Sequence, residues 1–301
     1  MLEPDRIAFY RDNGYLLVEA VFGPAELAEL RRVTADLVAA AREVSASNAV
    51  YDLAPEHGPA RPAVRRIKDP QNRHPVYAAA ARSKRLLDIV ADLLGPGVRF
   101  DHGKLNIKPV GGSAAIEWHQ DWAFYPHTND DLLAVGILLE DCTAEKGPLL
   151  VVPGSHKGPV YDHHHEGRFV GAFDPAVLGP ARETAVALTG AAGSCTFHHV
   201  RTVHGSADNE SDSPRPLLLF SYAAVDAWPL VDPVELAEFD GRILRGRPTL
   251  IPRQEAVPVR LPLPKDPAAD SIFDNQAAVS GQSFGAKSFW HGPAPLREEA
   301  T

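Results

Sequence analysis

The stretch that decides the fold begins at Val98, where the sequence reads VRFDHGKLNI over residues 98–107. Five more short runs, apolar or alternating between apolar and polar, follow it: AIEWH (115–119), LLAVGILL (132–139), LLVV (149–152), GSCTF (193–197) and PLLLFSYA (216–223). Glycine- and proline-containing turns separate several of these runs, as at Gly147-Pro148 and Pro153-Gly154-Ser155. Many short strands with such turns are typical of a β-barrel or of two packed sheets. We therefore predict a mainly β core over residues 98–225.

The segment before this core has the spacing of helices. After Pro24, apolar residues recur on one helical face, and a second such pattern covers residues 82–94 and ends at Gly95-Pro96-Gly97. After the core the chain is rich in proline and irregular, and its tail is rich in glycine, serine and alanine. The sequence thus predicts one α+β domain (1–301), with a helical front end (1–97), the β core (98–225) and an irregular C-terminal wrap or lid (226–301).

Composition and charge argue against several classes of protein. The chain has 301 residues, a formal net charge of -9 and a pI near 5.8, which disfavours a nucleic-acid partner. No apolar run approaches the ~20 residues of a membrane-spanning helix. The N-terminal sequence lacks the basic and apolar regions of a signal peptide, and the two cysteines, Cys142 and Cys195, cannot form a disulfide framework. We expect a cytoplasmic protein that binds neither nucleic acid nor membrane.

One short cluster of basic residues occurs in this otherwise acidic sequence. It consists of Arg61, Arg65, Arg66 and Lys68. Because short charge runs usually lie on solvated surface, we expect this cluster to form an exposed loop.

Thirteen histidines are the richest source of candidate chemistry. A His-x-carboxylate pair places two ligands on one face of a strand, although ~1.7 such pairs are expected by chance from this composition. Two pairs occur, His119-Gln120-Asp121 and His164-His165-Glu166. The first closes a strand-like run, whereas the second lies in a polar stretch that favours a solvated loop. Context therefore favours His119 and Asp121 as the functional pair.

Two downstream residues extend the first pair into a recognisable set. His204 lies far downstream of the pair, and eleven residues after it Arg215 enters the run at 216–223. Two histidines and one carboxylate are the ligand set of non-haem iron(II) oxygenases, in which the remaining coordination positions stay open. An arginine on a neighbouring strand can clamp a carboxylate with two parallel hydrogen bonds. The alternative for Arg215 is a structural ion pair with Asp212 or Glu210.

Three motifs together resemble the phytanoyl-CoA dioxygenase family. They are Glu117-Trp118-His119-Gln120-Asp121-Trp122, the stretch from Asp130-Asp131 to Val135, and Gly147-Pro148-Leu149-Leu150-Val151-Val152-Pro153-Gly154-Ser155-His156. His204-Gly205-Ser206 with Arg215 matches the second half of the family pattern, so the resemblance covers about residues 13–222. It implies a double-stranded β-helix of the jelly-roll or cupin-like kind, with Fe(II), 2-oxoglutarate and O₂ as cofactor and cosubstrates.

The resemblance also implies roles for single residues. His119, Asp121 and His204 would bind Fe(II), Arg215 would take the C5 carboxylate of 2-oxoglutarate, and Ser206 would help to hold it. Related halogenases carry a small residue in place of Asp121, so a carboxylate there implies hydroxylation or a related oxidation. Some members also use a lysine on an earlier strand for the cosubstrate, and Lys104 is the candidate that we put forward. Lys108, Arg66 and Lys68 remain alternatives to it.

The sequence therefore predicts an Fe(II)- and 2-oxoglutarate-dependent dioxygenase that hydroxylates a small molecule and releases succinate and CO₂. The alternative is a metal-binding cupin-like protein or isomerase that does not use 2-oxoglutarate. We also expect one of the adjacent His198 and His199 to face the site, because side chains alternate along a strand. Four aromatic residues are candidates for lining the substrate pocket: Trp122, Phe124, Tyr125 and Trp228.

Overall fold

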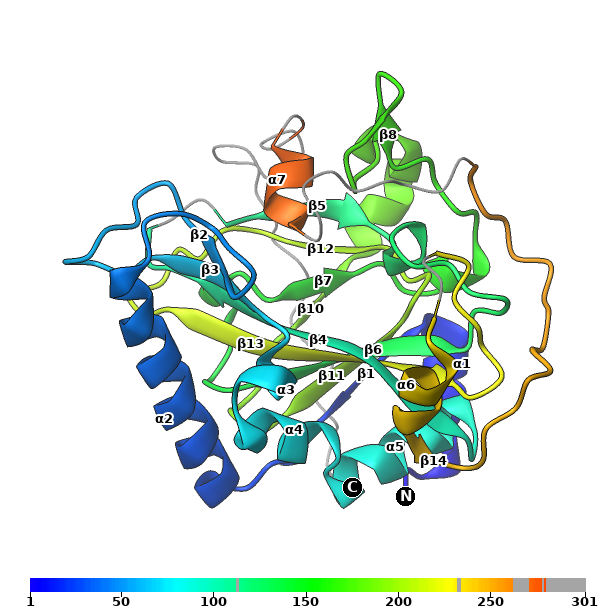
Figure 1. Cartoon of the computed structure of the whole chain (residues 1–301). Coiled ribbons are helices and arrows are strands. Elements are labelled where there is room, and N and C mark those ends of the chain that lie inside the picture. Colours follow the sequence, from blue (N-terminus) through cyan, green and yellow to red (C-terminus); the bar gives the residue numbers. More distant parts are fainter. Residues whose placement is uncertain (112–113, 232–233, 262–270, 278, 280–301) are drawn as a thin grey trace, which may run out of the picture.

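Two antiparallel sheets carry the fold, and they lie one above the other in Figure 1. The structure is a computed structural model, and it describes residues 1–111, 114–231, 234–261, 271–277 and 279. The larger sheet has the order β1-β11-β6-β13-β4-β3-β2, with β14 paired to β4, and the smaller has the order β10-β7-β12-β5. A short hairpin, β8 with β9, stands apart from both.

The strands of the larger sheet are β1 (Tyr15–Val18), β2 (Tyr51–Leu53), β3 (Val64–Lys68), β4 (Val98–Lys108), β6 (Leu132–Leu138), β11 (Cys195–His199), β13 (Arg215–Ala224) and β14 (Ile243–Arg245). Those of the smaller sheet are β5 (Ile116–His119), β7 (Leu149–Val151), β10 (Val186–Leu188) and β12 (His204–Ser206). The hairpin consists of β8 (His164–His165) and β9 (Arg168–Phe169). All six strand-like runs of the sequence thus form strands, and the prediction of a sheet-rich chain with helices is confirmed.

Helices cover the side of the larger sheet that faces away from the smaller one (Figure 1). They are α1 (Pro4–Asn13), α2 (Pro24–Ala40), α3 (Pro70–Arg73), α4 (Pro75–Ala81), α5 (Lys84–Leu94), α6 (Leu236–Gly241) and α7 (Ile272–Gln276), of which α7 lies instead beside β5. The helices expected over 24–38 and 82–94 are α2 and α5. α5 ends where Gly95 adopts a φ of 100°, a conformation that a residue with a side chain rarely adopts.

Residues 1–97 contain strands as well as helices. β1 pairs with β11, and β2 and β3 extend the larger sheet beyond β4. These strands are only three to five residues long, so their local pattern is weak and pairing with longer neighbours decides their conformation. The expectation that the basic cluster is an exposed loop is wrong for Arg65, Arg66 and Lys68, which lie in β3 and are buried or half-buried, whereas Arg61 is exposed.

Alternation along β4 separates an apolar face of the larger sheet from a polar one. Leu105 and Ile107 pack into the core beneath the helices, together with Leu218 and Phe220 of β13. Lys104, Asn106 and Lys108 therefore point to the opposite face, toward the smaller sheet. The Lys108 ammonium confirms this direction, because it donates a hydrogen bond to the carbonyl oxygen of Ala114 at 2.7 Å. We call this polar side the inner face.

The described part of the C-terminal segment includes α6, β14 and α7, and residues 246–261 after β14 contain no helix or strand, while residues 232–233 lie outside the described part. Gln276 of α7 accepts a hydrogen bond from the backbone N–H of Glu117 in β5 and donates one to the carbonyl of Gly171. Residues 262–270, 278 and 280–301 of the expected wrap or lid lie outside the described residues. Among the residues that are described, no helix is long and apolar enough to cross a membrane. Both cysteines are buried and unpaired.

Candidate metal centre

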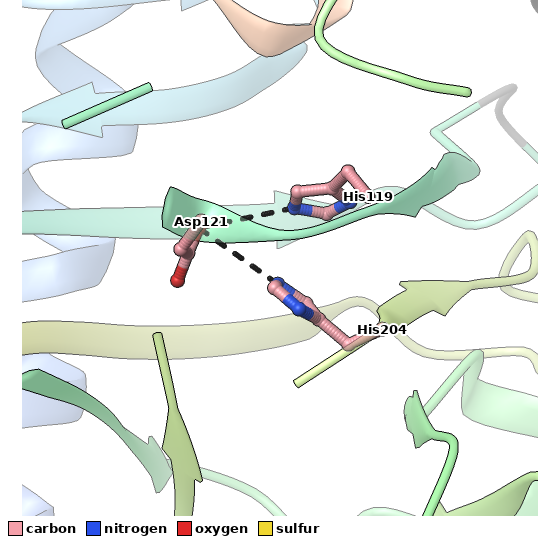
Figure 2. A group of neighbouring side chains, drawn as sticks. All are labelled: His119, Asp121 and His204. Carbon is pink, nitrogen blue, oxygen red and sulfur yellow. Dashed lines mark ion pairs between the residues drawn. The ribbon is translucent and has the colours of Figure 1, made fainter. Parts of the chain in front are cut away.

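The three candidate ligands meet at one edge of the smaller sheet (Figure 2). His119 ends β5, His204 begins β12, and the two are direct cross-strand partners whose rings lie 4.0 Å apart. The Oδ1 atom of Asp121 lies 3.9 Å from Nε2 of His119 and 3.8 Å from Nε2 of His204. One ligand atom from each residue fits within 4.8 Å of the other two.

Asp121 reaches this position although β5 ends at His119. Gln120 retains extended backbone angles, with φ -123° and ψ 129°, before a 3₁₀ turn begins at Asp121. The alternation of side chains therefore continues for two residues past the strand, which brings Asp121 to the same side as His119. Both oxygen and nitrogen atoms of the Gln120 amide are held by other chain segments, through the N–H of Tyr161 and the carbonyls of Pro159 and Arg201.

Backbone carbonyls set the tautomers of both histidines. Nδ1 of His119 donates to the carbonyl of Glu117, and Nδ1 of His204 donates to the carbonyl of Thr202, each at 2.8 Å. Because a carbonyl oxygen can only accept, the proton of each neutral ring lies on Nδ1 and the lone pair on Nε2. Such a hydrogen bond is the usual way in which a protein orients a metal-binding histidine. The two lone pairs point toward the Asp121 carboxylate.

The protonation states of the three residues suit a divalent cation. Burial lowers the pKa of His119 to about 4, and it holds the pKa of His204 well below its usual value. Burial by itself raises the pKa of Asp121, but the neighbouring His204, His198 and Lys104 outweigh it and hold that pKa well below its ordinary value. At neutral pH the group thus consists of two neutral imidazoles and one carboxylate, which bind metal without first losing protons.

A fourth histidine contacts this group. His198 of β11 is 1% exposed, and its Nε2 lies 3.3 Å from Oδ2 of Asp121, the carboxylate oxygen that does not face the other two histidines. Its ring also packs 4.4 Å from that of His204. The expectation that one of the two adjacent histidines faces the site is confirmed, because His199 instead packs 5.2 Å from His156. Alternation predicts that one of them faces inward but does not identify its partner.

Arg215 begins β13 and is buried. Its Nη2 donates to the carbonyl of Gly147 at 2.5 Å, and its Nε donates to the carbonyl of Lys146 at 3.4 Å. The alternative ion pairs with Asp212 or Glu210 are not formed, and within the described ranges Arg215 contacts no carboxylate. Burial lowers the pKa of Arg215, although the effect of Cys142 opposes this shift. A buried guanidinium with carbonyl partners only is well placed to receive an anion.

The remaining basic candidates differ in what they contact. Lys108 donates to the carbonyls of Ala114, Ser206 and Ala207, so its three N–H groups are already occupied. Arg66 and Lys68 both form ion pairs with Asp52, at 2.6 and 2.9 Å. Ser206 is buried on β12 opposite Ile116. The charged groups of Lys108, Arg66 and Lys68 thus already have partners.

Lys104 lies on the inner face within electrostatic range of Asp121. Burial lowers the pKa of Lys104, the charge of Asp121 opposes this shift, and that of Arg66 adds to it. Among the described residues Lys104 has no ion-pair partner within 4 Å. Among the basic candidates, Lys104 is the one whose charge acts on both His119 and Asp121.

The four aromatic residues that the sequence suggests for the substrate pocket differ in their surroundings. Phe124 packs edge-on to His119, with ring centroids 5.8 Å apart, and Tyr125 interacts with Asp121 electrostatically. Trp122 is buried, donates to the carbonyl of Pro258 and lines a cavity, whereas the half-buried Trp228 packs on Phe239. The second His-x-carboxylate pair is not brought into the cluster.

That second pair lies in the β8–β9 hairpin. Nδ1 of His164 lies 2.7 Å from Asp162 Oδ1, and Glu166 is exposed in the turn with a φ of 50°. The expectation of a solvated loop is confirmed for the exposed turn at Glu166 but is wrong for His164, whose side chain is 9% exposed and which lies in β8.

Comparison with known proteins places this geometry in context. A family model described as phytanoyl-CoA dioxygenase matches residues 10–217. A "probable alpha-ketoglutarate-dependent hypophosphite dioxygenase" of Stutzerimonas stutzeri is 36% identical over 279 residues, which cover 91% of this chain and 97% of that protein.

Two solved structures of EctD from S. alaskensis are also similar. The structure with bound Fe has a TM-score of 0.64 at 25% identity and covers 85% of this chain and 88% of its own. The structure with 2-oxoglutarate and 5-hydroxyectoine has a TM-score of 0.62 at 25% identity, covering 86% and 88%.

Proposed function

Because the chain belongs to the phytanoyl-CoA dioxygenase family, we propose that His119, Asp121 and His204 hold the iron of an enzyme that hydroxylates a small substrate. The family and the relatives show that the chain is an Fe(II)- and 2-oxoglutarate-dependent dioxygenase, an oxidoreductase that also consumes O₂. The alternative of a cupin-like protein without 2-oxoglutarate is thereby set aside. The two unpaired cysteines favour a reducing compartment such as the cytoplasm.

The observation that carries the site assignment is the convergence of two Nε2 lone pairs and one carboxylate oxygen in a buried position. This donor set fits Fe(II), which accepts imidazole and carboxylate ligands on one face of an octahedron. When bound, iron supplies the open positions at which 2-oxoglutarate and O₂ react, with succinate and CO₂ as coproducts. The chain's own contribution is to orient the ligands and to exclude water, for which Phe124 packs against His119.

Arg215 is the proposed anchor of the cosubstrate. Its fork of N–H groups matches the two oxygens of the C5 carboxylate of 2-oxoglutarate, and the buried hydroxyl of Ser206 on the adjacent sheet is the proposed helper. Carbonyl partners on one side of the guanidinium fix its orientation. In this proposal Arg215 is a hydrogen-bond donor that is already oriented before the C5 carboxylate of 2-oxoglutarate binds.

The finer fold assignment belongs to the same proposal. Two antiparallel sheets that enclose the ligands between them support a double-stranded β-helix, the jelly-roll arrangement. We also propose that residues 1–301 form one domain. Its support is that Gln276 near the C-terminus hydrogen-bonds to β5 beside the metal ligands, as a wrapping segment would.

An anaerobic titration tests the class and the site together. Adding Fe(II) and then 2-oxoglutarate to the protein is expected to produce a weak visible charge-transfer band, because the cosubstrate chelates a metal with open positions. Succinate release in air is then measured with candidate substrates, of which hypophosphite and ectoine are the first to try. An iron complex that gives no band with 2-oxoglutarate would contradict the proposal.

His198 is expected to act as a positioning residue for Asp121. Replacement of His198 by phenylalanine keeps a ring but removes the N–H donor at Oδ2, so Fe(II) affinity should fall about 10- to 100-fold, the usual effect of losing such a partner. His198→Gln, whose amide can donate to the same oxygen, should restore most of the affinity. His199→Phe, on the neighbouring position, is the matched control and should bind Fe(II) as the wild type does.

The two readouts separate positioning from simple loss of stability. If His198 only stabilises the fold, both His198→Phe and His198→Gln should have lower unfolding temperatures than the wild type. If His198 positions Asp121, the two variants should instead differ in their affinity for Fe(II). Equal Fe(II) affinity in wild type and His198→Phe would overturn this role.

A further inference from the structure

The register of β3 against β4 gathers basic residues on the inner face. Arg66 is the cross-strand partner of Asn106, and Lys68 is the partner of Lys104. Directly paired residues of an antiparallel sheet point to the same side. The pair between them, Ile67 with Leu105, is fully buried in the core under the helices and so points the other way. Arg66, Lys68 and Lys104 therefore share one face, on the side of the metal ligands.

An irregularity in β3 adds a fourth cation. Asp52 pairs with Arg66 and Leu53 pairs with Val64, which leaves Arg65 as one extra residue opposite β2. Val64 and Ile67 both belong to the core, so Arg65 and Arg66 between them lie on the opposite side. The Arg65 guanidinium lies 5.2 Å from the ring centroid of Phe273 in α7, the helix beside β5. A β-bulge thus directs Arg65 toward the smaller sheet.

We define the cationic wall as these four residues, Arg65, Arg66, Lys68 and Lys104. Asp52 is its carboxylate partner, and both oxygens of that group are already engaged, Oδ2 by Arg66 and Oδ1 by Lys68. Arg65 and Lys104 form no ion pair with any residue that the structure describes. Asp52 is the carboxylate that forms ion pairs with the wall among the described residues, so positive charge on these partly buried side chains exceeds the paired negative charge, an arrangement that favours an additional anion.

Unpartnered polar atoms lie along the same wall. Asn106 is 6% exposed, and its Oδ1 has no hydrogen-bond partner among the described residues. Nε of Arg65 is likewise buried without an acceptor in the part of the chain that is described. Buried polar atoms in folded proteins usually have partners, so such atoms on one face indicate a place where a ligand completes the hydrogen bonding.

The wall lies at a different position from the proposed cosubstrate anchor. Arg215 pairs with Lys108, whereas the wall meets β4 two residues earlier at Asn106, the partner of Arg66, and four residues earlier at Lys104. At the usual rise of ~3.4 Å per residue, Lys104 and Lys108 lie about 14 Å apart along β4. Lys104 is also the member of the wall that interacts electrostatically with Asp121 and His119. Arg215 and Lys104 therefore lie at different positions along β4.

We propose that the cationic wall binds an oxyanion group of the substrate, so that the enzyme acts on a small anionic molecule. This inference rests on the proposed function and adds the substrate class. Arginine and lysine offer donors only, and their planar and point-charge geometries match carboxylate, phosphinate and phosphonate oxygens. It also assigns Lys104, which the family resemblance associated with the cosubstrate, to the substrate.

The test measures anion binding to the anaerobic holoenzyme loaded with Fe(II) and 2-oxoglutarate. Hypophosphite, acetate and methylphosphonate are titrated separately by calorimetry and by the shift of the visible band. We expect at least one of these anions to bind the wild type, and Lys104→Met to weaken that binding about tenfold or more through loss of a charge-assisted hydrogen bond. Arg65→Met should act in the same direction. The relative affinities of the three probes identify the preferred oxyanion.

Arg61→Met is the matched control, because it removes a charge from the same stretch of sequence at an exposed position. It should bind the anions as the wild type does. Provided that the visible band still forms, three outcomes overturn the inference. The first is that no probe binds, and the second is that Arg61→Met weakens probe binding as much as Lys104→Met does. The third is that Lys104→Met weakens the binding of 2-oxoglutarate and leaves that of the probes unchanged. Absence of the band itself would instead contradict the proposed function.

Discussion

Replacement of Asp121 by alanine is expected to weaken Fe(II) binding by at least about 100-fold and to reduce 2-oxoglutarate-dependent succinate release to background. Asp121 is the anionic ligand of the set, and its Oδ1 faces both histidine nitrogens. Loss of a hydrogen-bond partner to a ligand already lowers metal affinity about 10- to 100-fold, so loss of the ligand has a larger effect. Anaerobic titration with Fe(II), followed by a succinate assay, gives both quantities.

His164→Ala is the control for Asp121→Ala, because it disrupts the other His-x-carboxylate pair. That pair lies in the β8–β9 hairpin outside the cluster, so Fe(II) affinity should remain at the wild-type value. Full activity of Asp121→Ala would show that the ligand set is wrong. Loss of iron from His164→Ala would show that the second pair binds the metal.

Replacement of Arg215 by methionine is expected to raise the KM for 2-oxoglutarate by about 30-fold to more than 1,000-fold. Removing one partner of a buried, hydrogen-bonded charge pair costs about 2–5 kcal/mol, which corresponds to that range. Fe(II) affinity should stay within about twofold, because Arg215 contacts carbonyl groups and none of the three metal ligands. Steady-state succinate release at varied 2-oxoglutarate measures the first quantity, and the iron titration measures the second.

Two further variants make the result on Arg215 specific. Arg215→Lys keeps the charge but loses the planar fork, so its KM should lie between those of the wild type and Arg215→Met. Arg168→Met removes an exposed cation on β9 and should leave the KM unchanged. An unchanged KM in Arg215→Met would refute the anchor, and a parallel loss of iron would assign Arg215 to the structure of the metal site.

Spacing along the chain already determined much of this protein. Strand-length runs between glycine and proline turns predicted six strands, and helical periodicity predicted α2 and α5, because such patterns are local and repeat at the period of the element. The pair His119 and Asp121, with His204 and Arg215 downstream, indicated the chemistry because its residue types match one ligand set. These conclusions needed no knowledge of which strands pair.

Tertiary structure alone decided which side chains meet. Packing of the two sheets brings His198 of β11 to Asp121, which follows β5. Pairing of β3 with β4, together with the bulge at Arg65, places residues of an expected surface loop in the cationic wall. The tertiary structure also distinguishes Lys104 from Lys108, because the ammonium of Lys108 already donates hydrogen bonds to backbone carbonyls. Strand register depends on contacts between residues far apart in the chain, and a one-residue bulge reverses which side chains face inward, so local sequence pattern could not fix either result.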